Sequence, residues 1–533
     1  MAGAAQISGH YKQLIPAGFK WWKQPRLWKL MFWTCLYILG NCANGYDGAL
    51  VSGMQILPYW LIDFNNPTGS TLGLLGAIQN IGSLGSIPVA PLWNDRFGRR
   101  KTVMLGTTMM ITGAALQASA KNVNWFLGGR CLLGFGGGFN NNADPLMVIE
   151  LCFPSHRHAI AGSYNSFTGI GSIIAAGLTF GTYYMASSWS WRLPALVQVL
   201  PSTIQFCLIM FGPESPRWLM LSGQEQKCFD TLVYYHGCGD PHDPLVLYEF
   251  EEMKESVRKE KENKRTQWKS LFRGPGMRRR SFIMMGLAIS GQWSGNSLIT
   301  YYLAQVLKTI NITDRPSQLG LNLALTAFNF ICAFTAGFHS DRFGRRRILL
   351  VSTSLMLLFF VCVTICSAQY NITHSNVAGD FVLLFIFLFT GAYAMGWSSV
   401  MLLYITEISP MSMRSKAHSL WAFSQASSQV LNQYTNPIAL GTMGWKYYIV
   451  FDALMVIILL FLYFFVVETK GLTLEETAML FDGVKEVEDL QKDADEHAAA
   501  DRIAVEQLQH NGNGEESPDP EKGSIHYRED VNA

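Results

Sequence analysis

Apolar residues recur along this chain in long blocks separated by short polar segments. The blocks approach the length of about 20 residues that a helix needs to cross the hydrocarbon of a membrane. About twelve such blocks are present, centred near residues 40, 82, 111, 136, 170, 202, 292, 328, 358, 391, 426 and 457. They lack the short alternating pattern of transmembrane strands. Because lipid offers no hydrogen-bond partner to the backbone, we predict an all-α membrane protein with twelve transmembrane helices.

The composition supports a membrane protein and excludes several other classes. Of the 533 residues 49% are hydrophobic and 15% are charged, whereas a soluble domain carries about 25% charged residues. A net charge of +2 gives no reason to expect a nucleic-acid partner. The cysteines form no C-x-x-C pair, so we expect no metal site and no cofactor. The glycines between 128 and 138 predict close helix packing in the membrane, not a nucleotide-binding loop.

Positive residues gather after every second apolar block. Runs such as Arg99-Arg100-Lys101 and Arg345-Arg346-Arg347 illustrate this, and they place both termini in the cytoplasm by the positive-inside rule. The sequons at Asn311 and Asn371 then fall in outer loops, where we expect glycosylation.

Two motifs occur once in each half of the chain. Asp-Arg-Phe-Gly-Arg-Arg begins at Asp95 and returns at Asp341, an offset of 341 − 95 = 246 residues. A glutamate also precedes an arginine by seven positions at the ends of the fourth and tenth blocks. Such repetition predicts two pseudo-symmetric six-helix bundles with a substrate site between them, near the midplane of the membrane.

The blocks and repeats divide the chain into five parts. We expect a cytoplasmic N-terminal segment at 1–29, a first bundle at 30–213, a cytoplasmic central loop at 214–280, a second bundle at 281–468 and a cytoplasmic tail at 469–533. Polar, low-hydrophobicity composition predicts that this tail is disordered from about residue 483.

With these motifs the chain resembles the sugar porters of the Major Facilitator Superfamily. The resemblance covers about residues 30 to 482 and rests on an ordered set of motifs: Gly45-Tyr46-Asp47-Gly48, both Asp-Arg-Phe-Gly-Arg-Arg loops, Pro213-Glu214-Ser215-Pro216-Arg217, Gln292-Trp293-Ser294-Gly295-Asn296 and Glu468-Thr469-Lys470-Gly471. Gly291-Gln292 stands where hexose porters carry paired glutamines, and Ser297 where they commonly carry asparagine. The versions present here look more like the fungal lactose-permease and cellodextrin-transporter branch, which implies a disaccharide such as lactose or cellobiose.

Asp47 and Arg130 are ionisable residues inside predicted spans. An unpaired charge at a helix centre costs about 2.5–3.5 kcal/mol on the insertion scale. A rise of about 1.5 Å per residue places both at similar depth, so they can meet. With the resemblance, they are candidates for proton coupling; the alternative is a permanent ion pair between spans one and four.

Sugar recognition needs neutral donors and acceptors together with aromatic faces. Seven residues of second-half spans are candidates: Gln292, Asn296, Tyr301, Tyr302, Asn322, Trp397 and Asn432. The alternative for several of them is hydrogen bonding between helices.

Charges of both signs lie at the cytoplasmic ends of the spans in both halves. The resemblance implies that they form a gate that closes and opens the inner mouth; the alternative is that they only set the topology, as exposed pairs contribute about 0–1 kcal/mol. They are Asp95, Arg96, Arg99, Glu150, Arg157, Glu214, Arg217, Asp341, Arg342, Arg345, Glu407, Arg414 and Glu468.

The sequence and the resemblance together favour a proton-coupled sugar symporter that works by alternating access. We expect a monomer in the plasma membrane, with the sugar, the proton and the lipid bilayer as its partners. A facilitative hexose transporter and a porter-like sugar sensor are the alternatives. An enzyme is disfavoured because no nucleophile–base pair or metal cluster has the required spacing.

Overall fold

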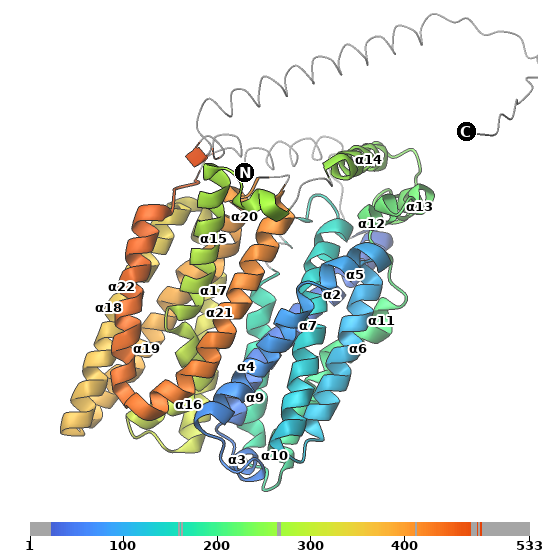
Figure 1. Ribbon diagram of the computed structural model, residues 1–533. Helices are drawn as coiled ribbons and strands as arrows, with labels where there is room; N and C mark the ends of the chain where they lie inside the picture. The colour runs from blue at the N-terminus through green and yellow to red at the C-terminus, as the bar shows by residue number, and fades with distance from the viewer. Residues whose placement is uncertain are drawn as a thin grey trace, which may run out of the picture. The chain divides into compact units, whose positions relative to one another are not determined.

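The computed structural model describes residues 23–157, 160, 164–263, 268–410, 413–470, 477, 480 and 481, and every regular element among them is a helix (Figure 1). The chain forms two units, residues 1–477 and 478–533. All helices discussed below belong to the first unit. The predicted disorder beyond about residue 483 and most of the predicted N-terminal segment lie outside the described residues.

The first half of the chain contains six helical segments, two of which are broken. They are α2 (Pro25–Met54), α4 (Gly69–Ser86) with α5 (Ala90–Phe97), α6 (Arg99–Ala118), α7 (Val123–Leu151), α9 (Ser166–Thr182), and α10 (Trp189–Val197) with α11 (Val199–Ile209). The short helix α3 (Pro58–Asp63) follows α2. The central loop forms α12 (Pro216–Leu221), α13 (Glu225–Tyr235), α14 (Pro244–Asn263) and the 3₁₀ turn η2 (Trp268–Phe272).

The second half repeats this plan. Its segments are α15 (Pro275–Trp293) with α16 (Asn296–Thr309), α17 (Arg315–Phe343), α18 (Arg345–Thr373), α19 (Asn376–Tyr393) with the π-helical η3 (Ala394–Ser398) and α20 (Ser399–Ile408), α21 (Arg414–Met443), and α22 (Tyr447–Phe465) after η5 (Gly444–Lys446). Figure 1 shows the two sets side by side, the first in blue to green and the second in yellow to orange.

Each of the twelve predicted block centres falls inside a different helix. By length and hydropathy alone, five helical stretches in the described residues can cross a membrane, or six if the bent pair α4 and α5 is one span. The other segments have polar or broken stretches that reduce this signal. For example, α7 carries Asn140, Asn141 and Asn142, and Gly295 separates α15 from α16 with a φ of +88°.

The internal repeat is visible in the helix ends. Gly98 ends α5 with a φ of +96°, and Gly344, which lies 344 − 98 = 246 residues later, ends α17 with a φ of +90°. A side chain would be strained at this φ. It would also collide with a neighbouring carboxylate, since an added Cβ lies 2.6 Å from Glu214 Oε2 in the first case and 2.8 Å from Glu468 Oε2 in the second. The two turns are therefore equivalent in backbone conformation and in the carboxylate that lies beside them.

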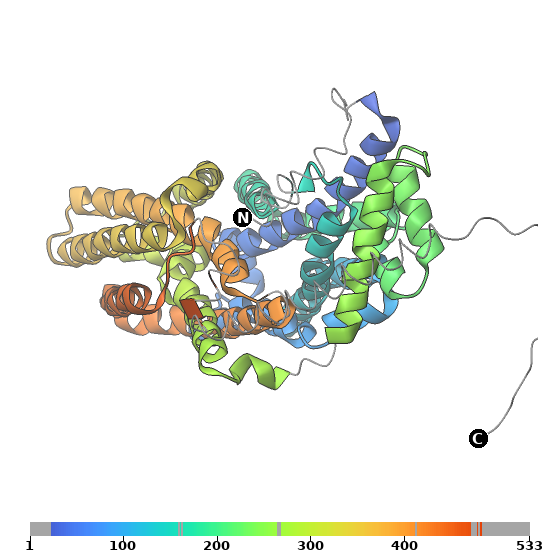
Figure 2. The ribbon, with the colours of Figure 1, turned by 90° about the horizontal axis from the view of Figure 1, so that it is seen from above.

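Small residues allow the helices of the first half to approach closely. A Cβ added at Gly134 of α7 would lie 1.9 Å from the backbone oxygen of Gln79 on α4, and one added at Gly45 of α2 would lie 1.9 Å from that of Thr168 on α9. The predicted packing role of the span-four glycines thus holds at Gly134. Between the halves, α4 lies against α21 and α9 against α17, which the turned view in Figure 2 also shows.

Candidate functional site

A cavity of about 180 Å³ lies among α2, α4, α7, α16 and α21, so both halves of the chain line it. Its walls carry amides, hydroxyls and one cation. The polar lining residues are Asn44, Gln55, Gln79, Asn80, Ser83, Arg130 and Asn141 from the first half, and Tyr301, Tyr302, Gln429 and Gln433 from the second. Neutral hydrogen-bonding groups of this kind suit a polyhydroxylated ligand.

The acid predicted for proton coupling lies behind this cavity, and its partner lies in the wall. Asp47 of α2 is 1% exposed and Arg130 of α7 is 3% exposed. An amide joins them: Arg130 Nη2 donates to Gln79 Oε1 at 2.5 Å, and Gln79 Nε2 donates to Asp47 Oδ2 at 3.5 Å. Gln198 donates to the other oxygen of Asp47. Both charges face the protein interior, as ionisable residues in membranes generally do.

The predicted meeting of Asp47 and Arg130 therefore occurs through Gln79. The approach of α7 to α4 at Gly134 brings the Gln79 side chain between them. This amide was not among the predicted site residues, because its role depends on the packing of α4, which the sequence does not reveal.

Tyr301 and Tyr302 are the two predicted substrate residues that line the cavity. They lie near the kink of α16, where Tyr302 has φ −128° and ψ 29°. The Tyr301 hydroxyl accepts from Gln429 Nε2 at 3.1 Å, and the Tyr302 hydroxyl donates to the Gln433 carbonyl at 2.6 Å. The two tyrosines are thus held in place by the neighbouring helix α21.

The other five predicted substrate residues are not in the lining. Asn432 Nδ2 donates to the Gln292 backbone oxygen at 2.6 Å, and Ser297 Oγ donates to Gln292 Oε1 at 3.3 Å. Trp397 is 1% exposed and its indole donates to Thr353 Oγ1 at 3.1 Å. These groups bond helix to helix in this conformation. The remaining two, Asn296 and Asn322, are outside the lining as well.

Hydrogen bonds connect the halves beside one end of the cavity, where α2 ends. Ser52 Oγ donates to the Thr300 carbonyl at 2.6 Å, and Gln55 Nε2 donates to the Tyr301 carbonyl at 3.2 Å. Both contacts join the end of α2 to α16.

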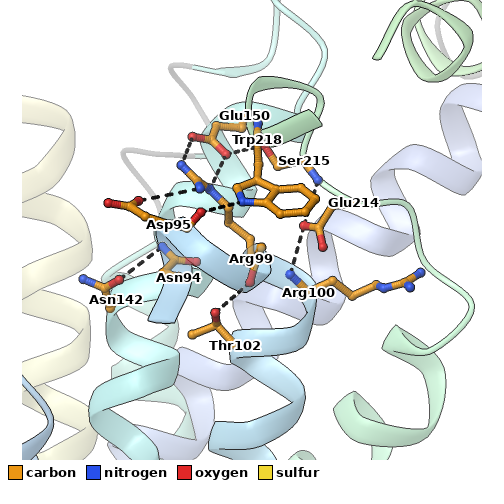
Figure 3. Close-up of polar contacts among 11 residues, drawn as sticks. Asn94, Asp95, Arg99, Arg100, Thr102, Asn142, Glu150, Glu214, Ser215 and Trp218 are labelled. Carbon is orange, nitrogen blue, oxygen red and sulfur yellow. Dashed lines mark hydrogen bonds and ion pairs between the residues drawn. The ribbon is translucent and has the colours of Figure 1, made fainter. Parts of the chain in front are cut away.

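At the predicted cytoplasmic end of the first half, charged residues form a network around Arg99 (Figure 3). Its guanidinium makes two hydrogen bonds with the Glu150 carboxylate, at 3.1 and 3.3 Å, and Ser215 Oγ also donates to Glu150. Asp95 lies 3.9 Å from Arg99 as an ion pair. The Trp218 indole donates to the Asp95 carbonyl at 3.0 Å. The network ties α5, α6 and α7 to the start of α12.

Glu214 lies beside this network and has a partly desolvated carboxyl. Burial raises its pKa, against the lowering effect of the backbone N–H groups of Arg100 and Ser215, which both donate to it at 3.0 Å.

The second half repeats the network. Arg345 Nη2 lies 2.9 Å from Glu407 Oε1, the Arg345 backbone N–H donates to Glu468 at 2.8 Å, and Thr469 Oγ1 donates to Glu407 at 2.6 Å. Arg345 occupies the position of Arg99 shifted by 345 − 99 = 246 residues, and Glu468 takes the place of Glu214. The side chains of Asp341, Arg342 and Arg414 lie outside the described residues.

The remaining predicted gate residues contact the central loop or solvent. Arg157 lies 3.6 Å from Glu249, a buried residue of α14 that also bonds His236 Nδ1 at 2.5 Å. Arg217 donates to Ser256 Oγ at 3.4 Å, and Arg96 is exposed.

Sequence reasoning missed most of the cavity wall of the first half. A helical-period signal was present: Asn44, Gly48, Val51 and Gln55 follow a spacing of four, three and four residues, which places them on one face of α2. It also missed Asp144 of α7, a 0% exposed acid that accepts from Gln205 at 3.1 Å.

Comparison with known proteins assigns the chain to a family. The family model "Sugar (and other) transporter" matches residues 33–481. "Membrane transporter D1" of Leishmania donovani is 30% identical over 389 residues, which cover 72% of this chain and 69% of that protein. The "High-affinity glucose transporter" of Kluyveromyces lactis is 26% identical over 470 residues, covering 83% of this chain and 84% of that protein.

The fold comparison agrees with the sequence comparison. The inward-open structure of the xylose transporter XylE from E. coli superposes with a TM-score of 0.71 at 22% identity, covering 85% of this chain and 100% of that one. The structure of the proton:xylose symporter XylE bound to 6-bromo-6-deoxy-D-glucose gives a TM-score of 0.67 at 24% identity, with coverage of 85% and 99%. The matched relatives are transporters and not enzymes. The chain therefore belongs to the "Sugar (and other) transporter" family, and it is a multi-pass membrane protein.

Proposed function

We propose that this transporter moves its sugar together with a proton. The observation that carries the proposal is the group Asp47–Gln79–Arg130, an intramembrane acid linked to a cation in the wall of the cavity. Protonation of Asp47 would weaken its attraction to Arg130 and release the amide between them. A sugar bound against the same wall would favour one arrangement of this group, so binding and protonation become coupled. XylE, which shares this fold, is a proton:xylose symporter, and this supports the proposal.

The test is accumulation of labelled sugar in proteoliposomes under an imposed pH gradient. Asp47→Asn should abolish uptake of the sugar against its concentration gradient. The exchange of labelled for unlabelled sugar at equilibrium should continue. Asp380→Asn, which changes an exposed acid at the start of α19, is the matched control and should transport like the wild type. Undiminished accumulation by Asp47→Asn would refute proton coupling at this residue.

For the substrate we propose a disaccharide such as lactose or cellobiose, on the strength of the second-half motifs. A single hexose is the second candidate, because relatives are named as glucose or fructose transporters. Uptake of a panel of labelled mono- and disaccharides, with and without a protonophore, separates these substrates. It also separates symport from facilitated diffusion. A sensor would give no uptake at all but a transcriptional response to the sugar.

We further propose that the protein works as a monomer in the plasma membrane, with both termini in the cytoplasm. We also propose that the arginine networks stabilise the inner ends of the helices. Arg99→Lys keeps the charge but loses the two-point contact with Glu150. We expect slower transport at unchanged expression. Transport at the wild-type rate would count against this role of the network.

A further inference from the structure

Near one end of the cavity, two glycines lie where a side chain would meet few or no neighbouring atoms. A Cβ added at Gly48 of α2 would meet no atom within 4 Å, and one added at Gly137 of α7 would meet only the Asn44 amide oxygen, at 3.4 Å. Both residues line the cavity. Glycines in membrane helices usually allow close helix packing, as Gly134 does here against α4. At Gly48 and Gly137 the missing side chain instead leaves room inside the cavity.

Two amides border this space and bind each other. Asn44 Nδ2 donates to Asn141 Oδ1 at 2.6 Å. Among the described residues, the hydrogen bonds leave the Asn44 oxygen as an acceptor and the Asn141 nitrogen as a donor with capacity for a ligand. Asn141 is exposed although it lies in the middle of a membrane helix, since it faces the cavity. A neutral donor and a neutral acceptor side by side match the hydroxyl groups of a sugar ring.

The amide pair lies far along the cavity from the two tyrosines. Gln55, which bonds the Tyr301 backbone, and Asn44 are 55 − 44 = 11 residues apart on α2, or about 16 Å at 1.5 Å per residue. Arg130 and Asn141 mark the same interval on α7. The cavity volume of about 180 Å³ is thus distributed over a long, narrow space. Polar groups at both ends with glycines between them suit a ligand that is longer than one ring.

We propose that Asn44 and Asn141, with the open wall at Gly48 and Gly137, form a subsite for the second ring of a disaccharide. One ring would lie beside Tyr301 and Gln429, and the other against the amide pair. The subsite thereby determines the preference for two-ring over one-ring sugars. It rests on the proposed function only in that the substrate is a disaccharide.

The experiment uses the full-length protein in proteoliposomes. It measures how strongly unlabelled cellobiose, lactose and glucose each inhibit the uptake of a labelled sugar. Gly48→Val fills the open wall and Asn141→Leu removes the amide. Each should weaken disaccharide binding roughly tenfold and change glucose binding less than about twofold. Gly128→Val is the matched control, because Gly128 is exposed on α7, has open space around its Cβ and is not in the cavity lining.

Unchanged disaccharide binding, or an equal loss for one-ring and two-ring sugars, would overturn the subsite. Wild-type uptake of monosaccharides alone would also overturn it, while leaving proton-coupled sugar transport intact. Absence of uptake of any sugar by the folded wild type would instead refute the proposed function, so the two failures are distinguishable. Retained glucose uptake by Gly48→Val and Asn141→Leu shows that both variants are folded.

Discussion

The amide between the acid and the cation gives a quantitative test of how the coupling group works. Gln79→Leu keeps the size of the side chain but removes both of its hydrogen bonds. The bond from Arg130 is short, at 2.5 Å, whereas the bond to Asp47 is long, at 3.5 Å. A hydrogen bond to a charged group contributes about 1.5–3 kcal/mol, and one at the limit of the distance range adds little. The change therefore costs about 1.5–3 kcal/mol in the state in which the bridge is formed.

Since about 1.4 kcal/mol is a factor of ten in an equilibrium constant, this change shifts the balance of conformations by roughly 10- to 150-fold. The Nε atom of Arg130 is buried and has no hydrogen-bond partner among the described residues, so it does not compensate for the lost bond to Gln79. We expect accumulation of sugar under a pH gradient to fall at least about tenfold. The number of protons moved per sugar should fall as well. Both quantities are measured in one assay, from sugar uptake and from the pH of the external medium.

A second glutamine of the first half supplies the control. Gln117 of α6 is 0% exposed, and its side-chain oxygen and nitrogen both lack partners in the described structure. Replacing an unsatisfied polar group by an apolar one of the same shape is neutral or stabilising. Gln117→Leu should therefore transport like the wild type. If Gln79→Leu also accumulated sugar with the wild-type proton ratio, the bridge would have no role in coupling.

Three further predictions concern the surroundings of the site. Trp397→Phe removes the hydrogen bond to Thr353 and should lower the free energy of unfolding by about 0.5–1.5 kcal/mol without changing KM. A tenfold rise in KM would show instead that Trp397 contacts the substrate. Burial raises the pKa of Glu214, so the unfolded chain loses this proton at a lower pH than the folded chain. The stability of the wild type should therefore fall relative to that of Glu214→Gln as the pH rises above about 4.5. Melting curves at several pH values test this, and a difference in stability that is independent of pH would contradict it. Of the two sequon asparagines, Asn371 donates to the Ser367 carbonyl at 2.9 Å inside the last turn of α18. Asn311→Gln should therefore remove more glycan than Asn371→Gln in a eukaryotic host. Gel mobility before and after deglycosylation measures the glycan on each variant, and the opposite ranking would refute the prediction.

The parts of the structure that depend on one helix at a time were predictable. Hydropathy placed each predicted block centre inside a different helix, because the membrane acts on each helix separately. The repeated motif predicted two similar halves, and Gly98 and Gly344 share both a backbone conformation and a carboxylate partner. The expectation that Asp47 and Arg130 lie near each other rested on the helical rise, and both side chains are buried and joined through one amide.

The parts that depend on helix rotation and packing were not predictable. Gln292 and Asn432 are polar residues in spans, just as Asn44 and Gln429 are, and composition cannot tell which pair faces the cavity. The choice depends on how the helices pack, and the break at Gly295 and the kink at Tyr302 are two backbone features near this site. As a result Gln292 and Asn432 bond each other, while Tyr301 and Gln429 line the cavity together.

The distribution of contacts indicates which bonds must break when the transporter changes conformation. The two arginine pairs join helices of the same half, since Arg99 bonds Glu150 and Arg345 bonds Glu407. Between the halves, Ser52, Gln55 and Asn80 make side-chain hydrogen bonds, and Asn80 Nδ2 donates to Gln433 Oε1 at 2.7 Å. At about 0.5–1.5 kcal/mol each, these three bonds contribute about 1.5–4.5 kcal/mol. This lies within the roughly 5.5 kcal/mol that a ligand must supply to reverse a 1:99 equilibrium between two states. A ligand bound beside these contacts can therefore supply the free energy needed to break these three bonds.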